Sequence, residues 1–262
     1  MIKKGTSYIK TQDILKVKSI IVSQPDPNTA KSPYFELAEK YGLKIDFKPF
    51  IQVEGVPAKE FRNTRIHILD HSAVIFTSKT AIDHFFRISQ ELRLTIPDTM
   101  KYFCISEATA FYLQKYIVYR KRKIFYGDGK FSDLMSVMKK HRDENFLVPL
   151  SDVHKQEISE LLDAEGYKYT KAILYRTVSN DMSSIGELNY DIMVFFTPQG
   201  IRSLFENFPG FVQNDVKIAC FGPATAKAVR EAGLRLDIEA PTAEAPSMTM
   251  ALEQFIKKNN KA

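Results

Sequence analysis

Hydroxyl-bearing residues follow apolar, strand-like stretches at several places in this chain. Phe76 is followed by Thr77-Ser78-Lys79, and Phe196 is followed by Thr197-Pro198-Gln199. Residues 106–109 and 222–225 form two further turns of the same kind. Such turns lead from a strand into a helix, whose first N–H groups are free to bind a carboxylate or a phosphate. The four turns therefore predict a receptor for an anionic ligand, unless each hydroxyl only caps its own helix.

Other reactive arrangements are missing from the sequence. No glycine-rich dinucleotide or P-loop motif follows a predicted strand, and no Gly-x-Ser-x-Gly nucleophile turn occurs. His67 and His71 have the i,i+4 spacing of metal ligands, but the residues between them lead into a strand, so we expect them to flank a loop. If the protein is an enzyme, we expect it to work without a metal, an organic cofactor or a strong nucleophile.

The elements that carry these turns are duplicated along the chain. Three pairs of segments match in the same order: 36–42 with 160–166, 74–78 with 194–198, and 104–110 with 220–226. The spacing between partners changes only by loop-sized amounts, as expected of a duplicated unit. Cys104 and Cys220 fall at equivalent positions of the two copies, so we expect two buried, unbridged thiols.

Strands and helices alternate in each copy, which predicts parallel sheets covered on both faces. Ser32 and Pro33 mark the start of a helix that ends at Gly42, and Ser151 is expected to cap a helix that runs to residue 165. The predicted strands are 19–23, 44–53, 73–76, 102–105, 146–149, 167–178, 192–196, 217–221 and 235–239. The predicted helices also include 58–65, 80–92, 107–115, 201–207, 224–232 and 247–257.

Composition agrees with a globular chain of two domains. The 262 residues are 44% hydrophobic and 26% charged, and no apolar stretch approaches the length of a membrane span. The formal net charge of +6 comes from residues 1–18 (+4) and 257–262 (+3), which leaves −1 for the body. We therefore expect no nucleic-acid partner and no membrane, and we interpret the basic run 120–123 as a solvated connector. Two cysteines and no secretory signal predict a cytoplasmic location.

Several motifs resemble the uroporphyrinogen-III synthase family. These are the duplicated Phe-Thr-Ser and Phe-Thr-Pro turns, the stretch 221–233 (FGPATAKAVREAG) and the segment Ile173-Leu174-Tyr175-Arg176-Thr177. The resemblance covers about residues 19–256. It implies two α/β lobes, each a parallel sheet flanked by helices, joined by a two-stranded ladder with an open cleft between them. One lobe would contain residues 1–47 and 175–262 and the other residues 48–174, with strands 44–53 and 167–178 as the ladder.

The resemblance also implies a reaction and its residues. The substrate would be hydroxymethylbilane, a linear tetrapyrrole with eight carboxylates, which the enzyme cyclises with loss of water and inversion of ring D. Tyr175 is then the candidate acid that protonates the departing hydroxyl, unless its ring only packs a core. We expect a cofactor-free lyase of haem biosynthesis that acts as a monomer. The candidate substrate-binding residues are Thr77, Ser78, Lys79, Thr109, Ser151, Thr197, Gln199, Gly222 and Thr225.

Departures from the family pattern leave two alternatives open. Ser23-Gln24 replaces a common Thr-Arg pair, Glu107 stands where a glycine is usual, and Pro198 stands where a serine is frequent. The chain could therefore be a degenerate relative of the synthases. The two-lobed architecture would also suit a non-catalytic receptor that closes around a small anion, because a fold does not fix a function.

Overall fold

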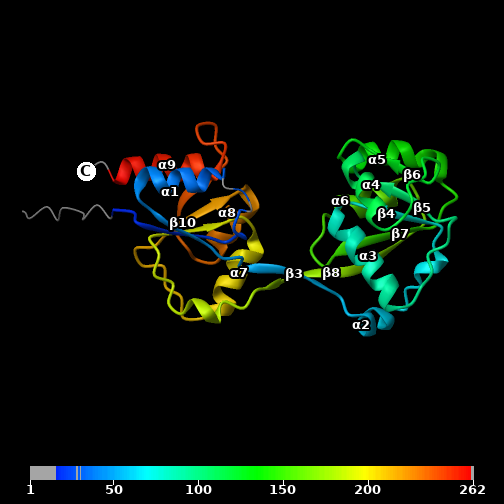
Figure 1. Ribbon diagram of the computed structural model, residues 1–262, viewed down its shortest axis with the longest axis horizontal. Helices are drawn as coiled ribbons and strands as arrows, with labels where there is room; N and C mark the ends of the chain where they lie inside the picture. Colours follow the sequence, from blue (N-terminus) through cyan, green and yellow to red (C-terminus); the bar gives the residue numbers. More distant parts are fainter. Residues whose placement is uncertain (1–15, 28, 30, 261–262) are drawn as a thin grey trace, which may run out of the picture. The chain divides into compact units, whose positions relative to one another are not determined.

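Short apolar runs of the sequence become the central strands of two separate sheets, each with helices on both faces (Figure 1). The computed structural model describes residues 16–27, 29 and 31–260. One unit contains the described residues up to Gln52 and those from Val178 onward, and the other contains Val53–Thr177. The predicted α/β fold class is confirmed. The two boundaries between the units follow residues 52 and 177, a few residues beyond the expected boundaries at 47/48 and 174/175.

The first unit holds a five-stranded sheet in the order β11-β10-β9-β1-β2, and every neighbouring pair is parallel. Its strands are β1 (Ser19–Val22), β2 (Lys44–Phe47), β9 (Ile192–Phe195), β10 (Lys217–Phe221) and β11 (Leu236–Ala240). One apolar cluster joins the sheet to α1 (Pro33–Tyr41) and α9 (Met248–Asn259). A second cluster joins it to α7 (Pro198–Asn207) and α8 (Pro223–Glu231).

The second unit holds a six-stranded sheet in the order β3-β8-β7-β4-β5-β6. Its strands are β3 (Ile51–Gly55), β4 (Ala73–Phe76), β5 (Lys101–Cys104), β6 (Ile124–Tyr126), β7 (Phe146–Ser151) and β8 (Tyr169–Ser179). One apolar cluster includes residues of α2 (Ala58–Asn63), α3 (Lys79–Glu91) and α4 (Glu107–Tyr112). The opposite cluster includes residues of α5 (Phe131–Met138) and α6 (Glu157–Ala164). Short 3-10 turns lie at Ile68–Asp70, Leu113–Lys115, Lys139–His141 and Ser183–Ile185.

Apart from the additional edge strand β3, the two sheets have the same strand order, which confirms the predicted duplication. Strands β1 and β2 of the first unit correspond to β7 and β8 of the second, and β9-β10-β11 correspond to β4-β5-β6. Each unit therefore combines the first part of one repeat with the second part of the other. Cys104 and Cys220 occupy equivalent strands in different sheets and are free and buried, as expected. Burial raises the pKa of Cys104 to about 12 and that of Cys220 to about 11.

The structure corrects the alignment of the duplicated turns by one residue. Sequence matching pairs Thr77 with Thr197, but β4 ends at Phe76 and β9 already ends at Phe195. The N-cap of α3 is Ser78, whose side chain accepts a hydrogen bond from Ala81 N, and the N-cap of α7 is Thr197. Ser78 and Thr197 are therefore equivalent, and Thr77 corresponds to Phe196.

Two other predicted elements are wrong. The expected strand 44–53 is broken around Pro49, which has no N–H to donate to a sheet. Strand β2 therefore pairs with β1 in the first sheet, while β3 lies beside β8 in the second, so only residues 51–55 face the long strand β8. The helix expected from Ser151 begins only at Glu157, because Ser151 is the last residue of β7 and its hydroxyl donates to Asp152.

The sequence prediction missed strand β6 and helix α5 entirely. Helix α5 has apolar residues at Phe131, Leu134, Met135 and Met138, which is helical spacing, and all four are buried. By contrast, the local signals of α1 are confirmed: Ser32 caps it, Pro33 opens it, and Gly42 ends it with φ 63°. The basic residues before Lys16, and Lys261 at the other end, lie outside the described residues.

Candidate active site

A cavity of about 390 Å³ lies in the second unit, beside the turn that follows β4 and the C-terminal end of β7. The first residues of α5 and α6 also line it. Ligands of open parallel sheets bind at this end, where strand termini meet helix N-termini. The polar lining residues used below are Thr77, Ser78, Lys130, Ser151, Lys155 and Tyr175.

Tyr175 reaches the cavity from β8. Its backbone carbonyl accepts a hydrogen bond from the N–H of Asp152 at 3.1 Å, which fixes the strand beside the end of β7. The half-buried ring stacks on the imidazole of His84, with ring centroids 5.0 Å apart and planes 16° apart. The phenol oxygen lies 3.4 Å from the hydroxyl of Ser78. Tyr175 is thus held by its backbone, by its ring face and at its hydroxyl.

Ser78 combines a structural contact with a contact to this phenol. Its Oγ accepts a hydrogen bond from Ala81 N at 3.0 Å and so caps α3. A hydroxyl that accepts in this way still has its own proton and a second lone pair. Either Ser78 or Tyr175 can therefore be the donor in the contact between them, so the pair provides a short route for a proton.

His84 and Arg87, which sequence reasoning missed, support Tyr175 from α3. Arg87 Nε donates to His84 Nδ1 at 3.1 Å, and this bond assigns the ring proton to Nε2. Partial burial, followed by the positive charge of Arg87, lowers the pKa of His84 below its usual value. The imidazole that stacks on Tyr175 is therefore neutral at neutral pH.

Arg87 also connects α3 to β8 and to the residue that follows β3, the strand next to β8. Its Nη2 donates to the carbonyl of Val56 at 2.8 Å and to that of Leu174, next to Tyr175, at 3.2 Å. Gly55 makes room for this, since a Cβ at that position would stand 2.7 Å from the guanidinium. The i,i+3 spacing of His84 and Arg87 is visible in the sequence. The contacts of Arg87 to residues 56 and 174 and that of His84 to Tyr175 depend on tertiary structure and could not be predicted.

The cavity carries a surplus of positive charge. Lys130 precedes α5 as its N-cap residue, and Lys155 precedes α6. Neither has an ion-pair partner within the described chain, and Glu157 is the acidic residue of the lining. Because two cations face one carboxylate, the lining favours an anionic ligand. A prediction of α5 from its apolar spacing would have located Lys130 at this helix start.

A histidine beside Ser151 adds a polar group to the same wall. Its Nδ1 lies 2.8 Å from the Ser151 carbonyl, so His154 donates there when this nitrogen carries the proton. The other ring nitrogen, Nε2, is buried and has no hydrogen-bond partner among the described residues. Asp152 is an exposed residue. Desolvation raises the pKa of its carboxyl, but hydrogen bonds from Ser151, Thr177 and Val153 lower it by more and keep the carboxylate charged.

Two predicted residues of this unit do not line the cavity. Lys79 lies with its ammonium 5.4 Å from the centre of the Tyr112 ring. Thr109 is buried in the first turn of α4, with its hydroxyl 3.0 Å from that of Ser106. The contact is local, as in the alternative left open above. Thr77, Ser78, Ser151 and Tyr175 are therefore the predicted residues that the second unit brings together.

The other predicted residues belong to the first unit. Thr197 accepts a hydrogen bond from Gly200 N at 3.1 Å, and Gln199 follows in the first turn of α7. Gly222 opens α8 with φ 89°, a backbone conformation that favours glycine, and Thr225 is buried in the first turn of that helix. These residues lie after β9 and β10, the strands equivalent to β4 and β5, and their part in binding stays a prediction.

Over the described ranges 16–27, 29 and 31–260, no cluster of three or more His, Cys, Asp or Glu residues has the arrangement of a metal site. His71 is engaged locally, with Nδ1 3.0 Å from the carbonyl of His67. None of the helices in these same ranges has the length and hydropathy needed to cross a membrane.

Comparison with known proteins identifies similarity to one family. Residues 32–250 match the family model described as uroporphyrinogen-III synthase HemD. A uroporphyrinogen-III synthetase from Helicobacter pylori has the same fold, with a TM-score of 0.56, 16% identity, and coverage of 92% of this chain and 99% of that one. A mutant uroporphyrinogen III synthase from Thermus thermophilus gives a TM-score of 0.51 and 18% identity, covering 94% of this chain and 100% of that one. No curated protein sequence matches the chain.

Proposed function

Because this chain belongs to the uroporphyrinogen-III synthase family, we propose that it is itself a working synthase. In this proposal it converts hydroxymethylbilane to uroporphyrinogen III, with loss of water and inversion of ring D, as a cofactor-free lyase. The observation that carries the proposal is the position of Tyr175, whose phenol faces Ser78 beside a cavity with two unpaired lysines among the described residues. This arrangement suits acid-assisted loss of a hydroxyl from a polycarboxylate.

The first step is the departure of the hydroxyl. Tyr175 donates its proton to that oxygen, the C–O bond breaks, and water leaves. The pyrrole nitrogen of the same ring releases its N–H proton to solvent, which yields a neutral azafulvene. A phenol has an ordinary pKa near 10 and is a weak acid, so acid assistance of this kind is worth roughly 10²–10⁴-fold in rate. Ser78, within 3.4 Å, is placed to donate a hydrogen bond to the resulting phenolate until a proton from solvent restores the phenol.

Ring closure needs position more than reactive groups. The substituted carbon of ring D attacks the azafulvene, and the resulting spiro intermediate fragments and closes again with ring D inverted. Unassisted closure gives the type I isomer, so the protein must hold the chain in the less accessible geometry. Fixing reactants in this way can remove up to roughly 7–11 kcal/mol of a barrier.

Substrate carboxylates provide the handles for that positioning. Lys130 and Lys155 are the candidate partners in the cavity, together with the N–H groups at the starts of α5 and α6. A charge at a helix N-terminus gains roughly 0.3–1 kcal/mol when exposed and more when water is excluded. We propose that Thr197, Gln199, Gly222 and Thr225 of the first unit also bind substrate carboxylates.

The test is a product analysis with the full chain. Hydroxymethylbilane is supplied, the reaction is stopped and oxidised, and the type III and type I isomers are separated by chromatography. Enrichment of type III over a protein-free blank supports the synthase. An unchanged ratio with tight binding of the substrate indicates the receptor, and an unchanged ratio without binding indicates a degenerate relative.

A further inference from the structure

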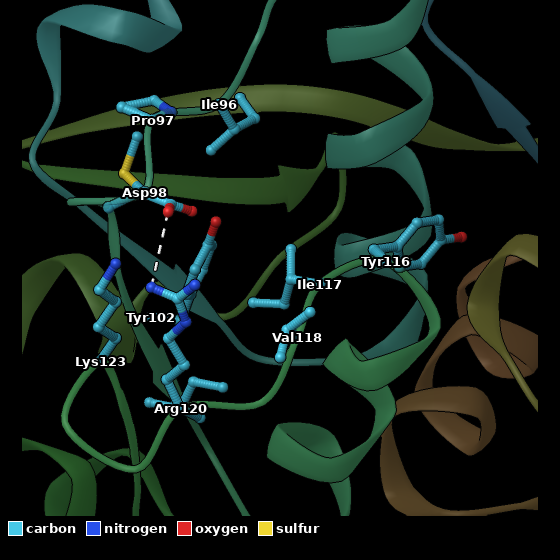
Figure 2. A pocket seen from close by; sticks show the side chains of 11 residues that line it. Ile96, Pro97, Asp98, Tyr102, Tyr116, Ile117, Val118, Arg120 and Lys123 are labelled. Carbon is cyan, nitrogen blue, oxygen red and sulfur yellow. Dashed lines mark ion pairs between the residues drawn. The ribbon is translucent and has the colours of Figure 1, made fainter.

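A second cavity, of about 250 Å³, lies in the second unit beside the N-terminal ends of β5 and β6, the opposite end of these strands from the site described above (Figure 2). The loop before β5 and the basic loop before β6 form its walls. Its volume is below the 300–1,000 Å³ that is usual for ligand pockets, so it suits a small molecule. The residues used in the argument are Ile96, Pro97, Asp98, Ile117, Arg120 and Lys123.

The duplication provides an internal comparison for this cavity. The loop before β5 and the loop before β10 have equal length, residues 92–100 and 208–216. The loop before β6, residues 116–123, has eight residues, whereas its counterpart before β11, residues 232–235, has four. Strand pairing aligns Tyr102–Ile124 with Ile218–Leu236, so Lys123 occupies the position of Arg235. The second unit therefore carries a four-residue insertion of largely basic character.

In the first unit, a network of polar side chains occupies the equivalent place, between the loop before β10 and the loop before β11. Arg235 donates to the carbonyls of Asn214 and Val216 and to the carboxylate of Asp237. The Gln213 amide donates to the carbonyls of Val216 and Arg235 and to Asp237. The positive charge of Arg235 is therefore neutralised by contacts within the first unit.

In the second unit these partners are replaced or missing. Pro97 stands in the position of Gln213. Asp237 is the extra residue of a bulge in β11 and has no counterpart in β6, because Phe125 pairs with Phe103 as Ile238 pairs with Ala219. Lys123, the counterpart of Arg235, has no ion pair or side-chain hydrogen bond among the residues that the structure describes. A cavity lined by both apolar and polar side chains, with a cation that has no partner among the described residues, takes the place of that network.

The charged side chains that line the cavity have a net charge of +1. Arg120 Nη1 lies 3.5 Å from the carboxylate of Asp98, and the exposed position of both side chains makes this a weak pair. Lys123 adds a second cation, so the charged lining residues sum to +1. Figure 2 shows the hydroxyl of Tyr102 on the same side as the Asp98 carboxylate and the Arg120 guanidinium. A single carboxylate in the cavity would neutralise the surplus.

We propose that this cavity is a binding site for a small organic monocarboxylate with an apolar body. The apolar part lies among Ile96, Pro97 and Ile117, and the carboxylate meets the ammonium of Lys123 and the guanidinium of Arg120. The ligand carboxylate then accepts from Lys123 as the carboxylate of Asp237 accepts from Arg235 in the first unit. The site is independent of the proposed synthase activity.

Calorimetric titration of the full chain tests the proposal, with 3-phenylpropanoate as the probe. Two matched controls separate its parts: 3-phenylpropanamide lacks the charge, and acetate lacks the apolar body. We expect saturable 1:1 binding of 3-phenylpropanoate that is about 10–100-fold tighter than that of either control, the range for a charge-assisted contact. If the wild-type chain shows no saturable binding, or binds the three compounds with equal affinity, the proposal is overturned before any variant is made.

Substitutions then locate the bound probe. Lys123→Gln and Arg120→Gln should each weaken 3-phenylpropanoate binding, whereas Arg122→Gln, an exposed cation of the same loop outside the lining, should not. Circular dichroism melting confirms that each variant is folded. Retained affinity in the two lining variants, or equal loss in all three, contradicts the assigned site.

Discussion

At the scale of single residues, the proposed chemistry depends on the hydroxyl of Tyr175. We expect Tyr175→Phe to lower turnover by roughly 10²–10⁴-fold, because the variant keeps the ring but cannot donate a proton. The stacking on His84 needs only the ring face, so the melting temperature should change little. Initial rates of type III formation and circular dichroism melting measure the two effects.

Tyr169 on the same strand provides the matched control for this variant. Its hydroxyl donates to Asp163 at 2.9 Å, and the residue does not line the cavity. Tyr169→Phe should therefore leave the rate within about twofold, because it removes only a surface contact. Wild-type turnover in Tyr175→Phe would show that Tyr175 has only a packing role.

His84 gives the site a dependence of stability on pH. Its pKa in the folded protein lies below the ordinary 6.5, mainly through burial. Between these two values the unfolded chain binds more protons than the folded chain, so stability is present above pH 6.5 and is lost as the pH falls. We expect wild type to lose more unfolding free energy than His84→Phe between about pH 7 and pH 5. Urea unfolding at both values measures the difference, and identical losses would contradict the assignment.

Some residues of this site could be predicted from the sequence, and others could not. Ser78 was accessible as a helix cap because capping depends on residues three positions apart. Tyr175 was identified from the resemblance of this sequence to one family, and its role is still a prediction. His84 and Arg87 were missed because their partners, Tyr175 and Leu174, are about ninety positions away and nothing local records the contact.

At the scale of elements, Ser78 should serve both the helix and the site. We expect Ser78→Ala to lower the free energy of unfolding by about 1 kcal/mol, the usual effect of a lost N-cap. It should also lower turnover, because the contact to the Tyr175 phenol is lost. Urea unfolding and rates of type III formation are measured on the same preparations.

Ser247→Ala is the matched variant for this comparison. Ser247 caps α9 in the first unit by accepting from Met250 N, and it is remote in sequence from every candidate site residue. The two substitutions should cost similar stability, but only Ser78→Ala should reduce the rate. Equal rates in both variants would mean that Ser78 is a cap alone.

Elements were predicted well where the signal is local and poorly where tertiary contacts decide. Both ends of α1 follow from Ser32, Pro33 and Gly42, each of which acts within one turn of the helix. The run 44–53 has apolar residues at short intervals, which favoured one long strand although Pro49 is a local signal against it. The pairing of β2 and β3 with different sheets shows that the strand is divided there. Helix α5 follows the basic run 120–123 and the turn residues 127–129, and only its apolar spacing marks it in the sequence.

At the scale of the whole molecule, the duplication organises both cores. Every member of the two apolar clusters of the second unit lies within residues 53–177, and those of the first unit lie outside that range. The repeat could be found in the sequence because its turns keep similar residues. The two repeats exchange parts: β1 and β2 lie in one sheet with β9, whereas β7 and β8 lie in the other sheet with β4. This exchange follows only from the strand pairing.

The continuous chain of the second unit allows its autonomy to be tested. We expect a fragment of residues 51–179, which keeps β3 and β8 whole, to fold cooperatively, because both of its apolar clusters are internal. It contains Tyr175 and the lysines of the cavity but lacks Thr197, Gln199, Gly222 and Thr225. If the first unit binds part of the substrate, the fragment should convert hydroxymethylbilane without enriching type III. Thermal unfolding and isomer chromatography measure the two properties separately, and a folded fragment that still makes type III would assign the whole reaction to the second unit.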